Sequence, residues 1–179
     1  MSQTTSRSRW SRLLCPLLLF SATALSAQSS GLSVGGAIGL VQLDGHPRTV
    51  IIGARLIAPL SPIVFVDAGV SWFSEDPPTS LADTLPGHLL PEVGLGIRVP
   101  FGRLHPYAVS GVGMVADLRR GGDASLALHL AAGLQVDVWN GWAARLDLRI
   151  RSLASPHSDS REVTLGVTKR LRLPWSGPD

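Results

Sequence analysis

Apolar and polar residues alternate strictly between Ser125 and Arg151. In the first half of this stretch the even positions are Leu, Ala or Val, and the odd positions are small or polar. After Trp139-Asn140-Gly141-Trp142 the alternation resumes, with apolar residues at even positions and Arg or Asp at odd positions from 145 onward. A period of two predicts strands, and Asn-Gly between two such runs is a strong hairpin signal. One apolar face and one charged face are typical of a transmembrane β-hairpin.

The same alternation recurs in six other segments, which predicts eight strands in all. These six segments are residues 32–43, 49–58, 63–73, 88–99, 105–118 and 161–172. In the fifth strand Asp117 sets the phase, so its odd residues face inward. In a membrane the sheet must close, because an open edge would leave unpaired N–H and C=O groups in hydrocarbon. The predicted fold is all-β, an eight-stranded antiparallel up-and-down transmembrane β-barrel.

The first 27 residues have the features of a secretory signal peptide. Arg7, Arg9 and Arg12 precede a short apolar core at 13–20, and small residues at 22–27 offer cleavage sites. The core is too short to span a membrane as a helix. We therefore expect cleavage near residue 27, an exported protein, and one barrel domain over residues 28–179.

Removal of the signal changes the charge of the chain. The full sequence has 16 Lys+Arg and 13 Asp+Glu, and three of the arginines lie before residue 28, which leaves 13 of each sign. The mature chain gives no reason to expect nucleic acid as a partner. The only cysteine, Cys15, lies in the signal, so no disulfide is expected. The histidines show no metal-ligand spacing, and we expect no cofactor.

The connections between strands alternate in character. Those after the second, fourth and sixth strands are tight and rich in Pro, Gly and Asn, whereas those after the third, fifth and seventh are more polar. Outer-membrane barrels have short periplasmic turns and longer outer loops. Aromatic residues fall at strand ends, where rings favour the membrane interface. The expected interface aromatics are Trp72, Phe73, Phe101, Tyr107, Trp139, Trp142 and Trp175.

Two segments, residues 106–113 (PYAVSGVG) and 163–171 (VTLGVTKRL), are similar to strands of small eight-stranded outer-membrane barrels. The chain resembles this class, which includes the OmpA transmembrane domain and the generic outer-membrane β-barrel domain, over roughly residues 31–174. The resemblance implies an outer-membrane location. It also implies membrane lipid and the outer-membrane insertion machinery as partners, and we expect a monomer with no identified ligand.

The inward face carries charges of both signs. The expected interior network comprises Arg55, Asp67, Glu92, Arg98, Asp117, His129, Asp137, Arg145, Asp147, Arg149, Arg151, Glu162, Arg170 and Arg172. Because eight strands enclose a space that side chains can fill, we expect ion pairs and no wide pore. The expected pairs are Asp137 with Arg145, and Asp147 with an arginine of the last strand. These features favour a structural or surface-interaction role without enzymatic activity.

Two alternatives remain open from the sequence. The segment 155–162 (SPHSDSRE) brings His157, serines and acids together at the outer rim, and similar-sized lipid A deacylases use a His/Ser pair near that surface. The second alternative is a soluble periplasmic lipid-binding barrel, which would need an apolar interior and a charged exterior. The sequence has the reverse sorting.

Overall fold

The computed structural model describes residues 31–43, 47–74, 87–118, 124–153 and 159–171. These residues form eight strands: β1 (Ser33–Leu43), β2 (Thr49–Pro59), β3 (Val64–Phe73), β4 (His88–Arg98), β5 (Leu104–Asp117), β6 (Ala124–Trp139), β7 (Trp142–Leu153) and β8 (Ser160–Arg170). The expected strand ends agree with these bounds to within two residues. The predicted signal peptide lies outside the described residues.

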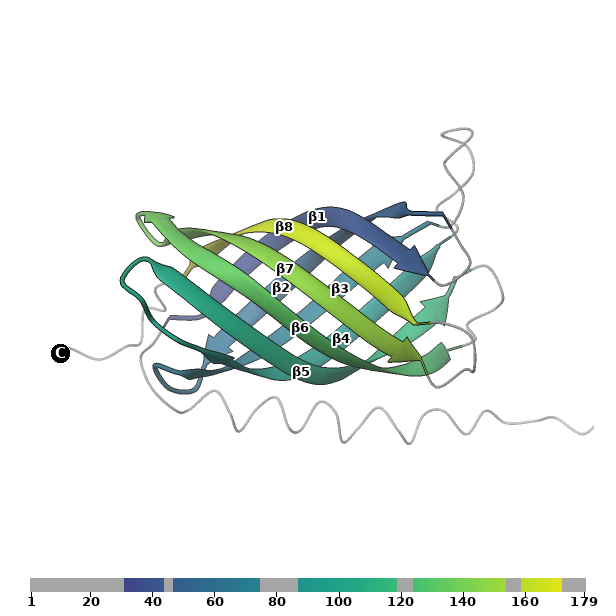
Figure 1. The fold of residues 1–179 in the computed structure, drawn as a ribbon, viewed down its shortest axis with the longest axis horizontal. Helices are drawn as coiled ribbons and strands as arrows, with labels where there is room; N and C mark the ends of the chain where they lie inside the picture. Colours follow the sequence, from purple (N-terminus) through teal and green to yellow (C-terminus); the bar gives the residue numbers. More distant parts are fainter. Residues whose placement is uncertain (1–30, 44–46, 75–86, 119–123, 154–158, 172–179) are drawn as a thin grey trace, which may run out of the picture.

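The eight strands form a closed barrel in which each strand pairs with its neighbours in the sequence (Figure 1). All pairs are antiparallel, and β1 closes the sheet by pairing with β8 from Ser33↔Arg170 to Leu43↔Ser160. This confirms the predicted up-and-down barrel. Among the described residues, no helix has the length and apolar character needed to cross a membrane.

One end of the barrel, which we call the turn end, is built by three tight connections. Between β6 and β7, Asn140 and Gly141 both have positive φ, 48° and 76°, as a two-residue type I′ hairpin turn requires. Between β4 and β5, Gly102 has a φ of 62°, and Phe101 and Leu104 exchange backbone hydrogen bonds. Between β2 and β3, the Ser61 hydroxyl accepts hydrogen bonds from the N–H groups of Ile63 and Val64. The opposite end is the loop end.

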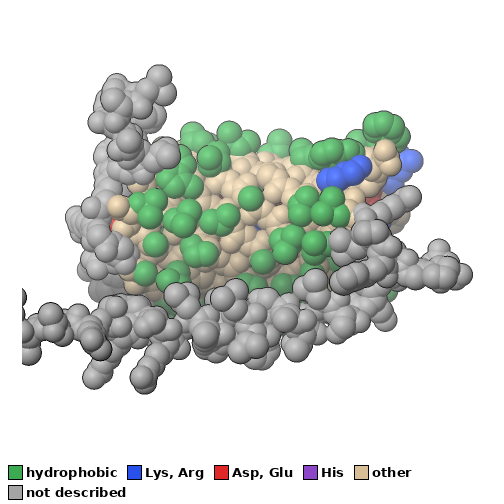
Figure 2. Space-filling model, turned by 180° about the vertical axis from the view of Figure 1, so that it is seen from behind, with side chains coloured by type: hydrophobic (Ala, Val, Ile, Leu, Met, Phe, Trp, Pro, Cys, Tyr) green, Lys and Arg blue, Asp and Glu red, His purple; other side chains and the backbone are tan. Residues whose placement is uncertain are grey.

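The outward face is apolar along all eight strands. Leu128 and Leu130 on β6, Leu95 on β4 and Leu165 on β8 are each about 60% exposed, at 59%, 65%, 60% and 62%. Figure 2 shows hydrophobic side chains spread over the visible side of the barrel, whereas Lys and Arg gather at the turn end, on the right. This sorting places apolar side chains against lipid and excludes the soluble lipid-binding barrel, whose exterior would be charged.

Candidate functional site: the charged interior

Eight buried charged residues form a belt across the barrel interior. The belt consists of Arg55, Asp67, Glu92, Arg145, Asp147, Arg149, Arg151 and Glu162, each at most 8% exposed. Four positive and four negative side chains give a net charge of zero. Such balance is needed because a buried charge without a partner is strongly destabilising.

Glu92 on β4 is the centre of one half of this belt. Its Oε1 lies 3.1 Å from the Nη2 of Arg55, and its Oε2 accepts hydrogen bonds from the Nε and Nη2 of Arg151 at 3.3 and 3.1 Å. Arg149 also pairs with Glu92, and Arg151 pairs with Glu162. One carboxylate of β4 therefore joins arginines of β2 and β7, which face it across the lumen.

Asp67 on β3 is the centre of the other half. Arg55 donates to its Oδ1 at 3.1 Å, and Arg145 donates to its Oδ2 at 3.2 Å. Arg145 also donates to Asp147, two residues along β7, at 3.1 Å. Because Arg55 contacts both Asp67 and Glu92, the two halves form one connected network.

The two ion pairs expected from the sequence are wrong. Asp137 does not pair with Arg145; its carboxylate accepts hydrogen bonds from Gln135 and contacts His105. Across the β6–β7 pair, Asp137 lies opposite Ala143, and Arg145 lies opposite Gln135. The long side chain of Arg145 reaches across the lumen to Asp67 on β3. Asp147 pairs with Arg145 of its own strand, because its neighbour on β8 is Thr164.

Tyr107 points into the interior and holds Arg145 in place. The Nε of Arg145 donates to the Tyr107 hydroxyl at 3.0 Å, and the guanidinium carbon lies 4.4 Å from the ring centroid. Phe65 packs edge-on against the same ring, at 6.1 Å and 79°. The phase of β5 expected from Asp117 places Tyr107 inside, and its 7% exposure agrees with this, so Tyr107 is a lumen residue and not an aromatic of the membrane interface.

Two apolar clusters flank the belt. Ile57, Phe65, Tyr107, Val109 and Ala131 form the turn-side cluster, and Val41, Ile51, Phe73 and Leu90 form the loop-side cluster. On β3, Asp67 lies between Phe65 and Phe73 in the sequence, so the charged layer is enclosed by apolar side chains on that wall. Eight strands enclose an interior that side chains of this size can fill.

Phe73 is the second interface aromatic that the structure corrects. Its side chain is 2% exposed and stacks on the His88 ring, with centroids 4.9 Å apart. Its odd position puts it on the same inward face as Asp67 and Ser71, which are buried. The alternation of β3 indicated that Phe73 faces inward, but its position at a strand end suggested the membrane interface.

The other expected interface aromatics at the turn end are exposed. Phe101, Trp139 and Trp142 are 63%, 75% and 45% exposed, and Trp142 also lies under the ammonium group of Lys169. Trp72 is partly buried on the outward face of β3. Trp175 lies outside the described residues.

The remaining residues of the expected network lie outside the belt. Arg98 ends β4 and donates to the carbonyl of Pro62, while Arg170 is exposed at the turn end. Asp117 is partly buried at the loop end of β5, opposite His88. His129 is buried, with its Nδ1 3.8 Å from the nearer Glu92 oxygen. Arg172 lies outside the described residues.

The belt carboxylates and arginines are arranged as ion pairs across the lumen. In the described part of the chain, no group of three or more His, Cys, Asp or Glu residues could hold a metal ion. Each of the four belt carboxylates binds at least one arginine. The sequence did not reveal Phe65 as a lumen residue, although the same parity that places Asp67 inside would have identified it.

Comparison with known proteins agrees with this architecture. The family model described as "Outer membrane protein beta-barrel domain" matches residues 13–170. No curated protein sequence matches the chain.

Solved structures of small barrels are similar in fold. Neisserial surface protein A is 12% identical, with 79% of this chain and 98% of that chain covered and a TM-score of 0.61. Ail, the attachment invasion locus protein of Yersinia pestis, is 16% identical (79% and 97% covered, TM-score 0.55). The outer membrane enzyme PagL is 14% identical (78% and 99% covered, TM-score 0.52), so an enzyme shares the fold.

The family match covers most of the chain, and the closed barrel with its apolar outer face agrees with it. The chain is therefore an outer-membrane protein and belongs to the outer membrane protein beta-barrel domain family.

Proposed function

We propose that this protein is a structural or surface-interaction barrel of the outer membrane that conducts no solute and catalyses no reaction. The observation that carries this proposal is the charged belt. Its eight side chains fill the lumen and neutralise one another, and apolar clusters pack beside them. A conducting barrel would need a continuous hydrated path, and eight strands enclose little more than the volume of their inward side chains.

The similar structures support a role at the cell surface. One of them is a neisserial surface protein and another an attachment invasion locus protein. By analogy, the loop end of this barrel would face the exterior and supply any contact with a partner. The closed sheet has no free edge, and this supports a monomer that contacts membrane lipid directly and is inserted by the outer-membrane machinery.

Planar-bilayer recording tests whether the interior is closed. The mature chain is refolded in detergent, and folding is verified by a shift between boiled and unboiled samples on a denaturing gel. We expect the folded protein to produce no stepwise current in molar KCl. Reproducible current steps from protein that shows the gel shift would contradict the closed interior.

The proposed absence of catalysis is supported by the residues around the hydrolase candidate. Ser160 and Glu162 of the 155–162 segment face the interior, and Glu162 binds Arg151. His157 lies outside the described residues. The test incubates the refolded protein with lipid A and measures released fatty acid by mass spectrometry. We expect no release; acyl release that is lost in His157→Ala would establish the hydrolase instead.

A further inference from the structure

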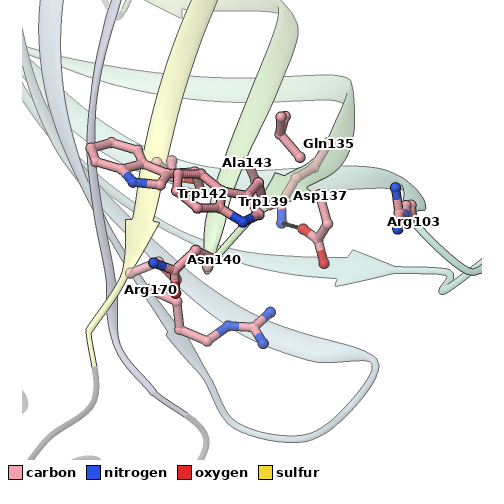
Figure 3. Close-up of a pocket in the computed structure, with 12 residues that line it drawn as sticks. Arg103, Gln135, Asp137, Trp139, Asn140, Trp142, Ala143 and Arg170 are labelled. Atoms are coloured by element: carbon pink, nitrogen blue, oxygen red, sulfur yellow. Dashed lines mark hydrogen bonds between the residues drawn. The ribbon is translucent and has the colours of Figure 1, made fainter.

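A cavity of about 390 Å³ lies at the turn end of the barrel (Figure 3). Its wall includes Arg103 from the β4–β5 turn, Asp137 and Trp139 from β6, Asn140 from the β6–β7 turn, and Arg170 from β8. The volume falls within the range of small-molecule sites. The cavity is separate from the charged belt, because none of the eight belt residues lines it.

The charges around this cavity are not balanced. Arg103 and Arg170 line it, and Arg98 ends β4 at the same end of the barrel. Asp137 is the only acid among the described residues that line it. Among the described residues, the two lining arginines and the one lining aspartate leave an excess of one positive charge, whereas the charged belt has none.

The single carboxylate is also already engaged. Its Oδ1 accepts a hydrogen bond from Gln135 at 3.1 Å, and its Oδ2 lies 3.2 Å from the Nε2 of His105. Within the described part of the chain, neither Arg103 nor Arg170 forms an ion pair with a carboxylate. Figure 3 shows these two arginines on opposite sides of Asp137, at the edge of the same space.

The chemistry of the wall favours an anion with several oxygens. Guanidinium groups donate in a planar fork that matches the oxygens of phosphate and retains its charge at all physiological pH values. Gln135, Asn140 and Thr168 add neutral donors to the lining. Trp139 and Trp142 are exposed beside the cavity, and such aromatic residues mark the level of the lipid headgroups.

We propose that the turn-end cavity is a phosphate-binding site, with Arg103 and Arg170 as its cationic ligands and Arg98 contributing further positive charge. The bound phosphate belongs either to the headgroup of a phospholipid in the adjacent leaflet or to a small soluble phosphate. The site adds a binding activity to a barrel that is otherwise closed, and its existence does not depend on the absence of conductance.

The test titrates the folded mature chain in octyl glucoside, a detergent without phosphate. One arm adds inorganic phosphate, and the other adds dihexanoylphosphatidylglycerol, with NaCl at matched ionic strength as the blank. The indole N–H signals of Trp139 and Trp142 and the Nε signal of Arg170 are followed by NMR. We expect saturable shifts of these signals. Saturation by phosphate identifies a soluble ligand, and saturation by the lipid alone identifies a headgroup.

Three variants make the result specific. Arg103→Gln with Arg170→Gln should weaken binding about tenfold or more, because two charge-assisted contacts are lost. Arg161→Gln, at an exposed outward position of β8 near the loop end, removes a positive charge elsewhere and should leave the affinity unchanged. Asp137→Asn should tighten binding, because it removes the only acid among the described residues of the wall.

The gel-shift assay verifies that each variant is folded before titration. Shifts that stay linear in both arms, or an affinity that is the same in the double variant and the parent, would overturn the proposal. If the double variant fails to fold, Asp137→Asn decides alone: tighter binding supports the site, and unchanged or weaker binding rejects it.

Discussion

Arg145 and Tyr107, on β7 and β5, meet inside the barrel although 38 residues separate them in the sequence. The guanidinium donates to the phenol oxygen and also lies over the ring. Tyr107 thus supplies both a hydrogen bond and a cation–π contact to an arginine whose other partners are Asp67 and Asp147. An aromatic residue of the turn-side cluster anchors one end of the charged belt.

Removing only the hydroxyl tests this anchor. Tyr107→Phe keeps the ring over Arg145 but leaves the buried Nε without its acceptor, which costs about 1–3 kcal/mol of unfolding free energy. Urea unfolding in lipid vesicles, followed by the gel shift, measures this loss. A stability equal to that of the parent would mean that the cation–π contact alone holds Arg145.

Glu92 is the most connected acid of the belt, and neutralising it should be costly. Glu92→Gln leaves Arg55, Arg149 and Arg151 with too little negative charge, so we expect a loss of about 3–5 kcal/mol.

A matched control is Asp137→Asn, the same chemical change at a partly exposed side chain. We expect it to cost less than about 1 kcal/mol. Both losses of unfolding free energy are measured by the same urea titration. Equal losses would show that burial within the belt does not increase the contribution of a carboxylate to stability.

Gly133 leaves room for the hydroxyl end of the Tyr107 side chain. A Cβ at position 133 would collide with the Tyr107 hydroxyl and with the Leu146 carbonyl. Gly133→Ala should therefore destabilise the barrel by about 1–3 kcal/mol through forced displacement of the ring.

Gly36 is the control for this substitution. It lies on the outward face of β1, where the nearest atom to an added Cβ is the Gly53 carbonyl oxygen at 3.7 Å. We expect Gly36→Ala to unfold at the same urea concentration as the parent within error. If Gly36→Ala were as damaging as Gly133→Ala, glycine would be required for its backbone and not for the space it leaves.

The depth of the outer face in the membrane can be measured with a single charge. Leu130 lies midway along β6 and is 65% exposed, so Leu130→Arg should cost about 2–4 kcal/mol of stability in lipid.

Val138, one residue from the turn-end limit of β6, gives the comparison. Val138→Arg should cost only about 0–1 kcal/mol, because its charge reaches the interface. The two losses of unfolding free energy are measured in lipid vesicles. Their ratio shows which of the two positions lies deeper in the hydrocarbon. Equal costs would contradict the placement of the turn end at the interface.

The sequence was sufficient for the elements and their faces, because both depend on short-range pattern. The period of two located the strands, Asn140-Gly141 located a turn that needs positive φ, and Asp117 set the correct phase of β5. The same parity also applied to Phe73, where the strand-end position led to the wrong assignment.

The partners of the interior charges could not be predicted in the same way. Arg145 and Asp67 are 78 residues apart and lie on strands that are not neighbours, so no local spacing relates them. Their meeting depends on the stagger that closure of the sheet imposes and on the reach of the arginine side chain. The turn-end cavity depends on the same geometry, since Arg103, Asp137 and Arg170 come from three separate parts of the chain.

The pairing of β1 with β8 makes the two ends of the described chain neighbours along a whole strand, from Ser33↔Arg170 to Leu43↔Ser160. Every partial chain that lacks β8 therefore has two open edges, which hydrocarbon does not tolerate. Completion of the structure has to wait until synthesis and export of the last strand are finished. The strand order alone therefore requires protection of the open edges. A chaperone could hold the first seven strands in water until then, or a machine could cover the edges during insertion.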